Sequence, residues 1–128
     1  MIEQSLDHFV LTTRDLDQCL AFYTGALGMT LERFGAGRIA LRFGEQKINV
    51  HPPGYEASIK ARRPTPGSLD LCFLAACPLE EVIARLQVHG VAIEEGPTLR
   101  TGARFAIRSV YVRDPDDNLI EISVPAEK

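Results

Sequence analysis

Apolar side chains recur with helical spacing in two segments of the chain, 15–27 and 78–89. Asp15 is placed to cap the start of the first segment, and Gly28 and Gly90 follow the two segments as stop signals. The sequence therefore predicts two amphipathic helices. Their apolar stripes are Leu16, Leu20, Tyr23 and Leu27 in the first helix, and Leu79, Val82, Ile83 and Leu86 in the second.

Short segments in which apolar and polar residues alternate surround each predicted helix. This period of two is typical of half-buried strands, and Gly, Pro or Asp residues separate the segments as turns. Each half of the chain then reads β-α-β-β-β. The predicted strands cover 5–13, 29–34, 38–43 and 46–51 in the first half, and 68–74, 91–95, 105–113 and 118–124 in the second.

An internal repeat supports this division into halves. Residues 5–11 read SLDHFVL and residues 68–74 read SLDLCFL, with the same residue at four of seven places. The stretch between the halves is rich in proline and glycine. We expect an α+β fold in which two β-α-β-β-β modules share one concave mixed sheet. The single domain, 1–128, would consist of module 1 (about 1–54), a linker (about 55–67) and module 2 (about 68–128).

The composition argues against three classes of protein: nucleic-acid binders, membrane proteins and disulfide-rich scaffolds. The 128 residues carry a net charge of −3, which does not suggest a nucleic-acid binder. No apolar run reaches the roughly 18 residues of a membrane span, and the first residues do not resemble a signal peptide. Three cysteines are too few and odd in number for a disulfide scaffold. We therefore expect a cytoplasmic protein whose partner is a small molecule, with neither nucleic acid nor membrane involved.

Side chains of the kinds that bind metal ions lie on the polar faces of four predicted strands. The alternation puts His8 and His51 in module 1, and Asp70 and Glu121 in module 2, on the faces away from the core. Two histidines and a carboxylate suit Fe, Ni, Mn or Zn. Three of them also have an ordinary explanation, since strand histidines are often solvated and Asp70 would also serve in a turn, whereas Glu121 lies between isoleucines and would need a partner for its charge. The repeat places Leu71, rather than Asp70, opposite His8.

Arginines gather between residues 97 and 113 with few acidic neighbours. One interpretation is a solvated loop and strand surface. The other is a clamp for an anionic substrate, because guanidinium binds anions bidentately. In that interpretation Arg100 and Arg104 contact the substrate and Tyr111 lines the pocket, although Tyr111 is equally suited to the core.

Two motifs carry a resemblance to a known family. LDHFVLTTRDLDQCLAFYTGALGM near the start and DPDDNLIEIS near the end resemble the vicinal oxygen chelate superfamily. This superfamily includes glyoxalase I, bleomycin-resistance proteins and extradiol dioxygenases. RFGEQKINVH and RPTPGSLDLCF are closer to the subgroup of glyoxalase domain-containing protein 5 and a virulence-associated bacterial protein. The resemblance extends over nearly the whole chain.

The resemblance implies a divalent metal ion that is chelated by two neighbouring oxygens of the substrate. It assigns His8 and Glu121 to the first and last ligand positions. The module 1 position falls at Asn49 or His51, of which imidazole is the stronger ligand. Asp70 stands where glyoxalase I has a further ligand. The candidates for proton transfer are a Glu121 displaced from the metal, or Asp70 if it is not a ligand. The chain departs from the family at Asp117, where glycine is usual.

Two functions are therefore expected from the sequence. The first is a metal-dependent glyoxalase-type lyase or isomerase, or a dioxygenase, acting on a small oxygenated substrate. The alternative is a metal-free module that sequesters a small molecule, as bleomycin-resistance proteins do. A homodimer is expected in both cases, because a half-open sheet leaves a face to cover.

Overall fold

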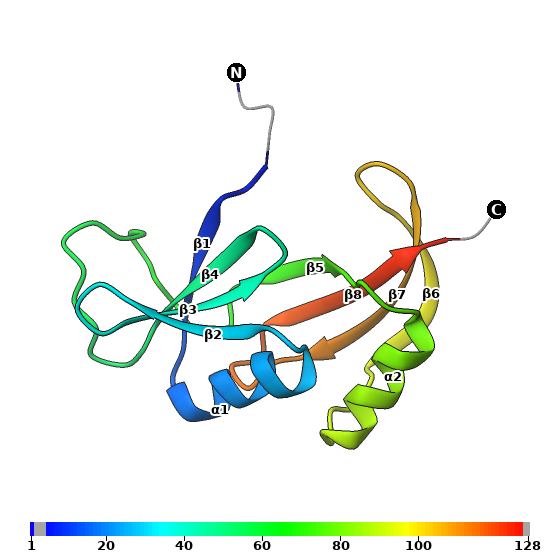
Figure 1. The fold of residues 1–128 in the computed structure, drawn as a ribbon, viewed down its shortest axis with the longest axis horizontal. Coiled ribbons are helices and arrows are strands. Elements are labelled where there is room, and N and C mark those ends of the chain that lie inside the picture. Colours follow the sequence, from blue (N-terminus) through cyan, green and yellow to red (C-terminus); the bar gives the residue numbers. More distant parts are fainter. Residues whose placement is uncertain (2–4, 127–128) are drawn as a thin grey trace. The chain divides into compact units, whose positions relative to one another are not determined.

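The structure, a computed structural model, describes residue 1 and residues 5–126. The chain forms two compact units, Met1–Pro66 and Gly67–Lys128, and each contains one four-stranded sheet (Figure 1). No helix in the described part is long and apolar enough to cross a membrane.

Unit 1 contains the sheet β1-β4-β3-β2. β1 pairs with β4 in parallel, and the other neighbours are antiparallel. The helix α1 continues as a π-helical turn, η1, between the first two strands. The elements are β1 (His8–Thr12), α1 (Leu16–Ala21), η1 (Phe22–Ala26), β2 (Thr30–Phe34), β3 (Arg38–Phe43) and β4 (Gln46–His51).

Unit 2 repeats this topology with the sheet β5-β8-β7-β6. Its parallel pair is β5 with β8, and α2 packs against β7 and β8. The elements are β5 (Asp70–Leu74), α2 (Leu79–Val88), β6 (Glu95–Thr101), β7 (Ala106–Arg113) and β8 (Leu119–Pro125). The α+β class and the β-α-β-β-β order of each half are confirmed. The eight strands form two sheets, one in each unit, rather than one hydrogen-bonded sheet.

One predicted strand was misplaced. The segment 91–95 was expected to be a strand, but the strand β6 begins only at Glu95. Gly96 and Pro97, near the start of β6, are accommodated because β6 is an edge strand, where a missing N–H is tolerated, and because its pairing with β7 shifts between Glu95 and Thr98.

The alternation of residues gives each sheet one apolar and one polar face. Leu11, Leu41 and Ile48 are fully buried in unit 1, as are Val112 and Ile120 in unit 2. His8, Asn49, Asp70 and Glu121 occupy the alternate positions on their strands. The apolar faces form the cores, so the candidate site residues lie on the opposite faces.

A buried turn sets the position of β8. The Asp114 carboxylate accepts hydrogen bonds from the backbone N–H groups of Asp116 and Asn118 at 2.9 Å, and from the Asn118 amide at 2.8 Å. Asn118 in turn accepts a bond from the backbone N–H of Leu69 at 2.8 Å. Asp117 has φ +68°, which Asp tolerates better than most residues. This turn therefore joins the starts of β5 and β8, the two strands that carry Asp70 and Glu121.

Candidate functional site

His8 begins β1 with one ring nitrogen already engaged. Its Nδ1 lies 2.7 Å from Oδ1 of Asp7, and this hydrogen bond is the main reason that the pKa of Asp7 lies below its ordinary value. A carboxylate that holds Nδ1–H leaves Nε2 with a free lone pair. Metal-binding histidines are commonly oriented in this way.

The register of β1 and β4 decides between the two candidate partners of His8. His8 lies opposite Lys47, so Asn49 is two residues further along β4 and His51 is four residues further. These offsets correspond to Cα separations of about 8 Å for Asn49 and about 14 Å for His51. Two side chains about 14 Å apart on one face do not reach a common ion. The prediction that His51 joins His8 as a ligand is therefore not supported by the register.

Asn49 is 5% exposed, and none of the described residues donates a hydrogen bond to its Oδ1. A buried acceptor without a donor costs free energy, so it is rare unless a ligand, ion or water satisfies it. Asn49 therefore has both the position and the chemistry of a metal ligand or a water-binding group.

His51 lines a small pocket together with Asn49, but it also has contacts of its own. Its ring packs against Tyr55, with 4.3 Å between ring centroids. Burial is the main reason that the pKa of His51 lies below its ordinary value, and the charges of Arg38 and Lys60 add to the effect. His51 lines a pocket of about 330 Å³ together with Arg14, Lys60 and several prolines of the 52–67 stretch. These contacts indicate that His51 forms part of the wall of that pocket.

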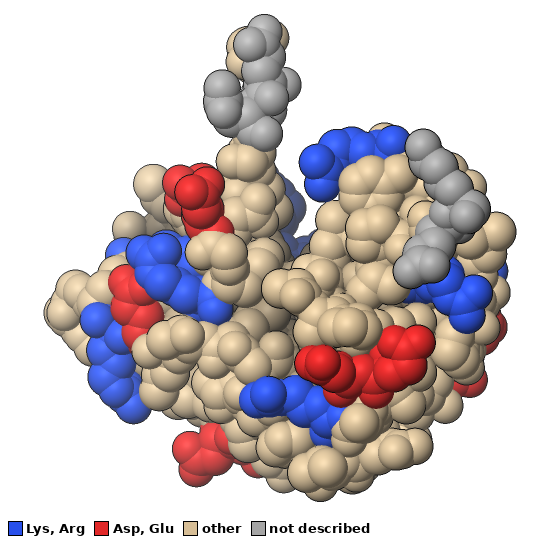
Figure 2. All heavy atoms as spheres, turned by 45° about the vertical axis from the view of Figure 1, so that its right-hand side comes forward, with Lys and Arg blue, Asp and Glu red and all other residues tan. Residues whose placement is uncertain are grey.

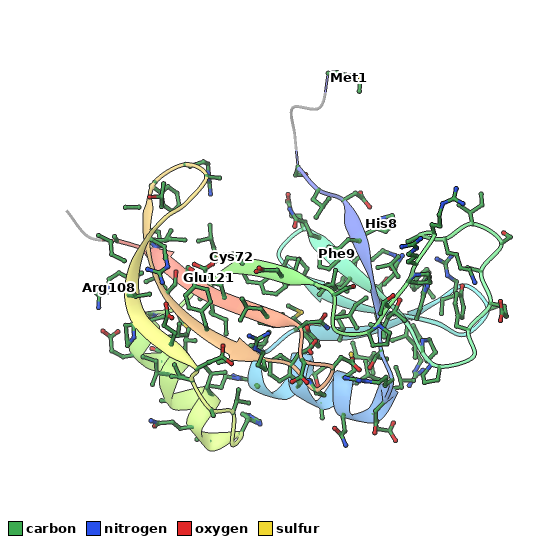
Figure 3. All side chains as sticks on the ribbon, turned by 180° about the vertical axis from the view of Figure 1, so that it is seen from behind. Met1, His8, Phe9, Cys72, Arg108 and Glu121 are labelled. Atoms are coloured by element: carbon green, nitrogen blue, oxygen red, sulfur yellow. The ribbon has the colours of Figure 1, made fainter. Side chains whose placement is uncertain are left out.

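Unit 2 has a pair of carboxylates, Asp70 and Glu121, separated by the same two residues of register as His8 and Asn49. Asp70 lies opposite Leu119, so Glu121 is two residues further along β8, as Asn49 is relative to His8. The structure thus aligns Asp70 with His8, whereas the sequence repeat aligned Leu71. Cys72 lies directly opposite Glu121, and Figure 3 shows these two residues side by side.

Glu121 is held by hydroxyl groups from two strands. Ser109 donates to its Oε2 at 2.5 Å, and Ser123 lies 3.4 Å from the same oxygen. The two serine oxygens are 2.7 Å apart, and Ser123 also contacts the Cys72 sulfur at 3.3 Å. Burial is the main cause that raises the pKa of the Cys72 thiol, and the charge of Glu121 also raises it. The network fixes one carboxylate oxygen of Glu121.

Arg100 was predicted to bind substrate, but its guanidinium is already engaged. Its Nε donates to the Tyr111 hydroxyl at 3.0 Å, one terminal nitrogen donates to Thr98 at 3.1 Å, and another pairs with Glu95. The bond to Tyr111 is the main reason that the pKa of Arg100 lies above its ordinary value. Arg100 therefore orients Tyr111, whose own O–H is not used in this bond.

The arginines and Glu121 line one pocket within unit 2. Its volume is about 360 Å³, within the range of small-molecule sites. The polar lining residues are Cys72, Arg100, Thr101, Arg104, Tyr111 and Glu121, and the apolar ones include Leu74, Phe105 and Ile107. The three residues predicted to contact substrate, Arg100, Arg104 and Tyr111, thus lie around the same space as Glu121.

The comparisons with known proteins decide the family. Residues 5–122 match the model of the Glyoxalase/Bleomycin resistance protein/Dioxygenase superfamily. The chain belongs to this superfamily. Members include proteins of different activities, so membership establishes the fold and the ancestry but not the reaction.

Several members of the superfamily are similar over nearly the full chain. Glyoxalase domain-containing protein RDO1 of Mycosarcoma maydis is 52% identical over 120 residues, covering 94% of this chain and 68% of that protein. Virulence protein STM3117 of Salmonella typhimurium is 49% identical over 123 residues, covering 96% and 85%. The solved structure of an integron cassette protein from V. cholerae has a TM-score of 0.95 at 49% identity, covering 98% of each chain.

Within the described residues no group of three or more His, Cys, Asp and Glu side chains is gathered as a complete metal site. Each unit instead contributes a pair, His8 with Asn49 and Asp70 with Glu121. The serines that hold Glu121 were missed from the sequence. Alternation would have found them, because Ser109 and Ser123 face the same side as Tyr111 and Glu121.

Proposed function

We propose that this chain is a metal-dependent enzyme of the glyoxalase or dioxygenase type that acts on a small oxygenated substrate. The observation that supports it most directly is that each unit has a pair of polar residues on its two parallel strands, separated by the same two residues of register. His8 with Asn49, and Asp70 with Glu121, occupy equivalent positions on the two parallel strand pairs. The proposal assigns His8 and Glu121 to one divalent ion, with Asn49 in place of the His51 predicted from the sequence.

The side chains fit such an ion chemically. His8 offers Nε2 because Asp7 holds Nδ1, Asn49 offers a buried oxygen without a donor, and Glu121 has one oxygen not held by Ser109. An imidazole with oxygen ligands suits Fe, Ni, Mn or Zn and does not select one of them.

A divalent ion bound by these groups supplies Lewis-acid stabilisation of negative charge on substrate oxygens. The residues around it would orient the substrate and move protons. Ser109 holds Oε2 of Glu121 and so limits the rotation of the carboxylate. Asp70 is exposed and lies at the diagonal position beside Glu121, so we assign it to proton transfer or to a further ligand position.

The alternative function is a metal-free module that sequesters a small molecule. It is favoured by the hydrogen bonds that His8 and Glu121 make to neighbouring side chains of their own units. Ligand-induced stabilisation that a chelator does not alter would identify this function.

Metal titration of the chelator-treated protein separates the two functions. Calorimetry with Fe(II), Ni(II), Mn(II) and Zn(II) should give one ion per chain, and His8→Ala and Glu121→Gln should each weaken binding by about 10–100-fold or more. Asn49→Ala should weaken it, whereas His51→Ala and His89→Ala serve as matched controls that should not. Binding no tighter than about 1 mM, unchanged in His8→Ala, would exclude the metal-dependent enzyme.

The reaction type needs a separate assay. Oxygen consumption with a set of catechols tests a dioxygenase, and loss of a hemithioacetal tests a glyoxalase. Asp70→Asn should lower the rate in whichever assay is positive, because it removes a carboxylate from the proposed proton-transfer position. An unchanged rate would remove Asp70 from the mechanism.

Assembly and compartment complete the proposal. We propose a homodimer, which sedimentation at micromolar concentration would contradict by showing only monomer. Among the described residues Cys19, Cys72 and Cys77 form no disulfide bond, which is compatible with the reducing, cytoplasmic compartment that we propose.

A further inference from the structure

The pocket beside Glu121 is closed at one side by the short loop between β6 and β7. Residues 102–105 of this loop, together with Thr101 at the end of β6 and Ile107 in β7, line about half of the space. The N–H of Gly102 donates to the carbonyl of Phe105 at 2.9 Å, which ties the two ends of the loop together. A Cβ on Gly102 would meet that carbonyl oxygen at 2.5 Å, so a tight turn is built into the sequence.

The two arginines of the pocket differ in their partners. Arg100 has its charge balanced by Glu95 and its remaining donors used by Thr98 and Tyr111. Arg104 has no carboxylate partner among the described residues and only lies over the Phe105 ring, 5.0 Å from its centroid. Figure 2 shows Lys and Arg side chains at the upper right of the face in view. The five donors of the Arg104 guanidinium are thus available to a ligand.

The wall next to Arg104 is apolar and accessible. Phe105 is 37% exposed and Leu74 is 49% exposed, and both line the pocket. Large apolar side chains that remain exposed around a hollow commonly mark a ligand site. A ligand here would meet an unpaired cation on the loop, an apolar surface beside it, and Glu121 with the Tyr111 hydroxyl further in.

We infer that the substrate of this protein carries a carboxylate or phosphonate-like anion on a short apolar body, and that Arg104 binds the anion. This inference rests on the proposed function, because the pocket includes Glu121. Arg100 is a positioning residue that holds Tyr111. Phe105 and Leu74 contact the apolar part, so the oxygens that react point toward Glu121.

The test uses the full-length protein treated with chelator, so that metal binding does not enter. Phenylacetate and benzylphosphonate are the anionic probes, 2-phenylacetamide is the neutral match, and acetate lacks the apolar body. Titration of ¹⁵N-labelled protein gives a dissociation constant and locates each probe. We expect saturable binding of both anionic probes, with shifts in residues 101–105, and at least about tenfold weaker binding of the amide and of acetate.

Variants separate the inferred site from general electrostatic attraction. Arg104→Gln should weaken phenylacetate binding at least about tenfold, and Arg104→Lys should restore part of it because the charge is kept. Arg108→Gln is the matched control, since it removes the same charge from the opposite face of β7 and should change binding less than about twofold. Lys60→Gln tests the pocket of unit 1 and should also have little effect.

Four outcomes would overturn the inference. These are no saturable binding of either anionic probe, equal affinity for the amide, equal losses in Arg104→Gln and Arg108→Gln, or a larger loss in Lys60→Gln. The result is independent of the metal titration. Anion binding that survives without any metal affinity would reject the proposed enzyme and leave the anion site in place, and the reverse would reject only the anion site.

Discussion

The Asp114 turn offers the sharpest test of how the fold holds Glu121 in place. Asp114 is 4% exposed, and its carboxylate accepts three hydrogen bonds, two from backbone N–H groups and one from the Asn118 amide. Asp114→Ala removes both acceptor oxygens, and with them all three hydrogen bonds, and leaves the three donors in a buried turn. Each unsatisfied buried donor costs about 1–3 kcal/mol. Because the turn can relax and admit water, we expect a total loss of about 3–5 kcal/mol.

A second substitution at the same position separates the contributions of the two carboxylate oxygens to this loss of unfolding free energy. Asp114→Asn keeps an oxygen for the two backbone N–H groups but places an amide nitrogen against the Asn118 amide, which is also a donor. It should therefore lose only about 1–3 kcal/mol. Glu45→Ala removes an exposed carboxylate from the β3–β4 turn and serves as the control, with an effect within about 0.5 kcal/mol.

Urea unfolding followed by circular dichroism measures the free energy of unfolding of the four proteins. The expected order of stability is wild type and Glu45→Ala, then Asp114→Asn, then Asp114→Ala. A loss below about 1 kcal/mol in Asp114→Ala would refute the idea that this carboxylate organises the turn. An Asp114→Asn variant as unstable as Asp114→Ala would refute the assignment of separate roles to its two oxygens.

Three further predictions follow from individual positions. Asp117→Gly should stabilise the protein by up to about 1 kcal/mol in the same urea assay, because φ at this residue is +68° and glycine adopts it without strain; a clear loss would show that the Asp117 side chain has a role of its own. Gly96→Ala should destabilise by about 2 kcal/mol or more, since φ is +105° and an added Cβ would overlap the carbonyl oxygen of Ser109; a neutral result would contradict this close packing of β6 on β7. Iodoacetamide should alkylate Cys72 well before Cys19 in the native protein, as peptide mass mapping would show, because residue Cys72 is exposed and Cys19 is fully buried. The raised pKa of the Cys72 thiol slows its alkylation but leaves it accessible, so equal rates would indicate that unit 1 opens readily.

The sequence alone determined which face of each strand holds the chemistry. The period of two placed His8 and Glu121 away from the cores, and Leu11 and Ile120 within them, because alternation is a local property of an extended chain. The two motifs at the ends of the chain also identified the superfamily. These features need only neighbouring residues, so no long-range information was required.

Only the tertiary structure decided which residues on those faces lie next to each other. Asn49 and His51 share a face, and the register places Asn49 two residues and His51 four residues along β4 from the position opposite His8. The same holds for Asp70, which the repeat missed by one residue, and for Arg100 and Arg104, which look alike in the sequence but differ in partners. Register and partner choice come from hydrogen bonds between distant strands, which a local pattern does not encode.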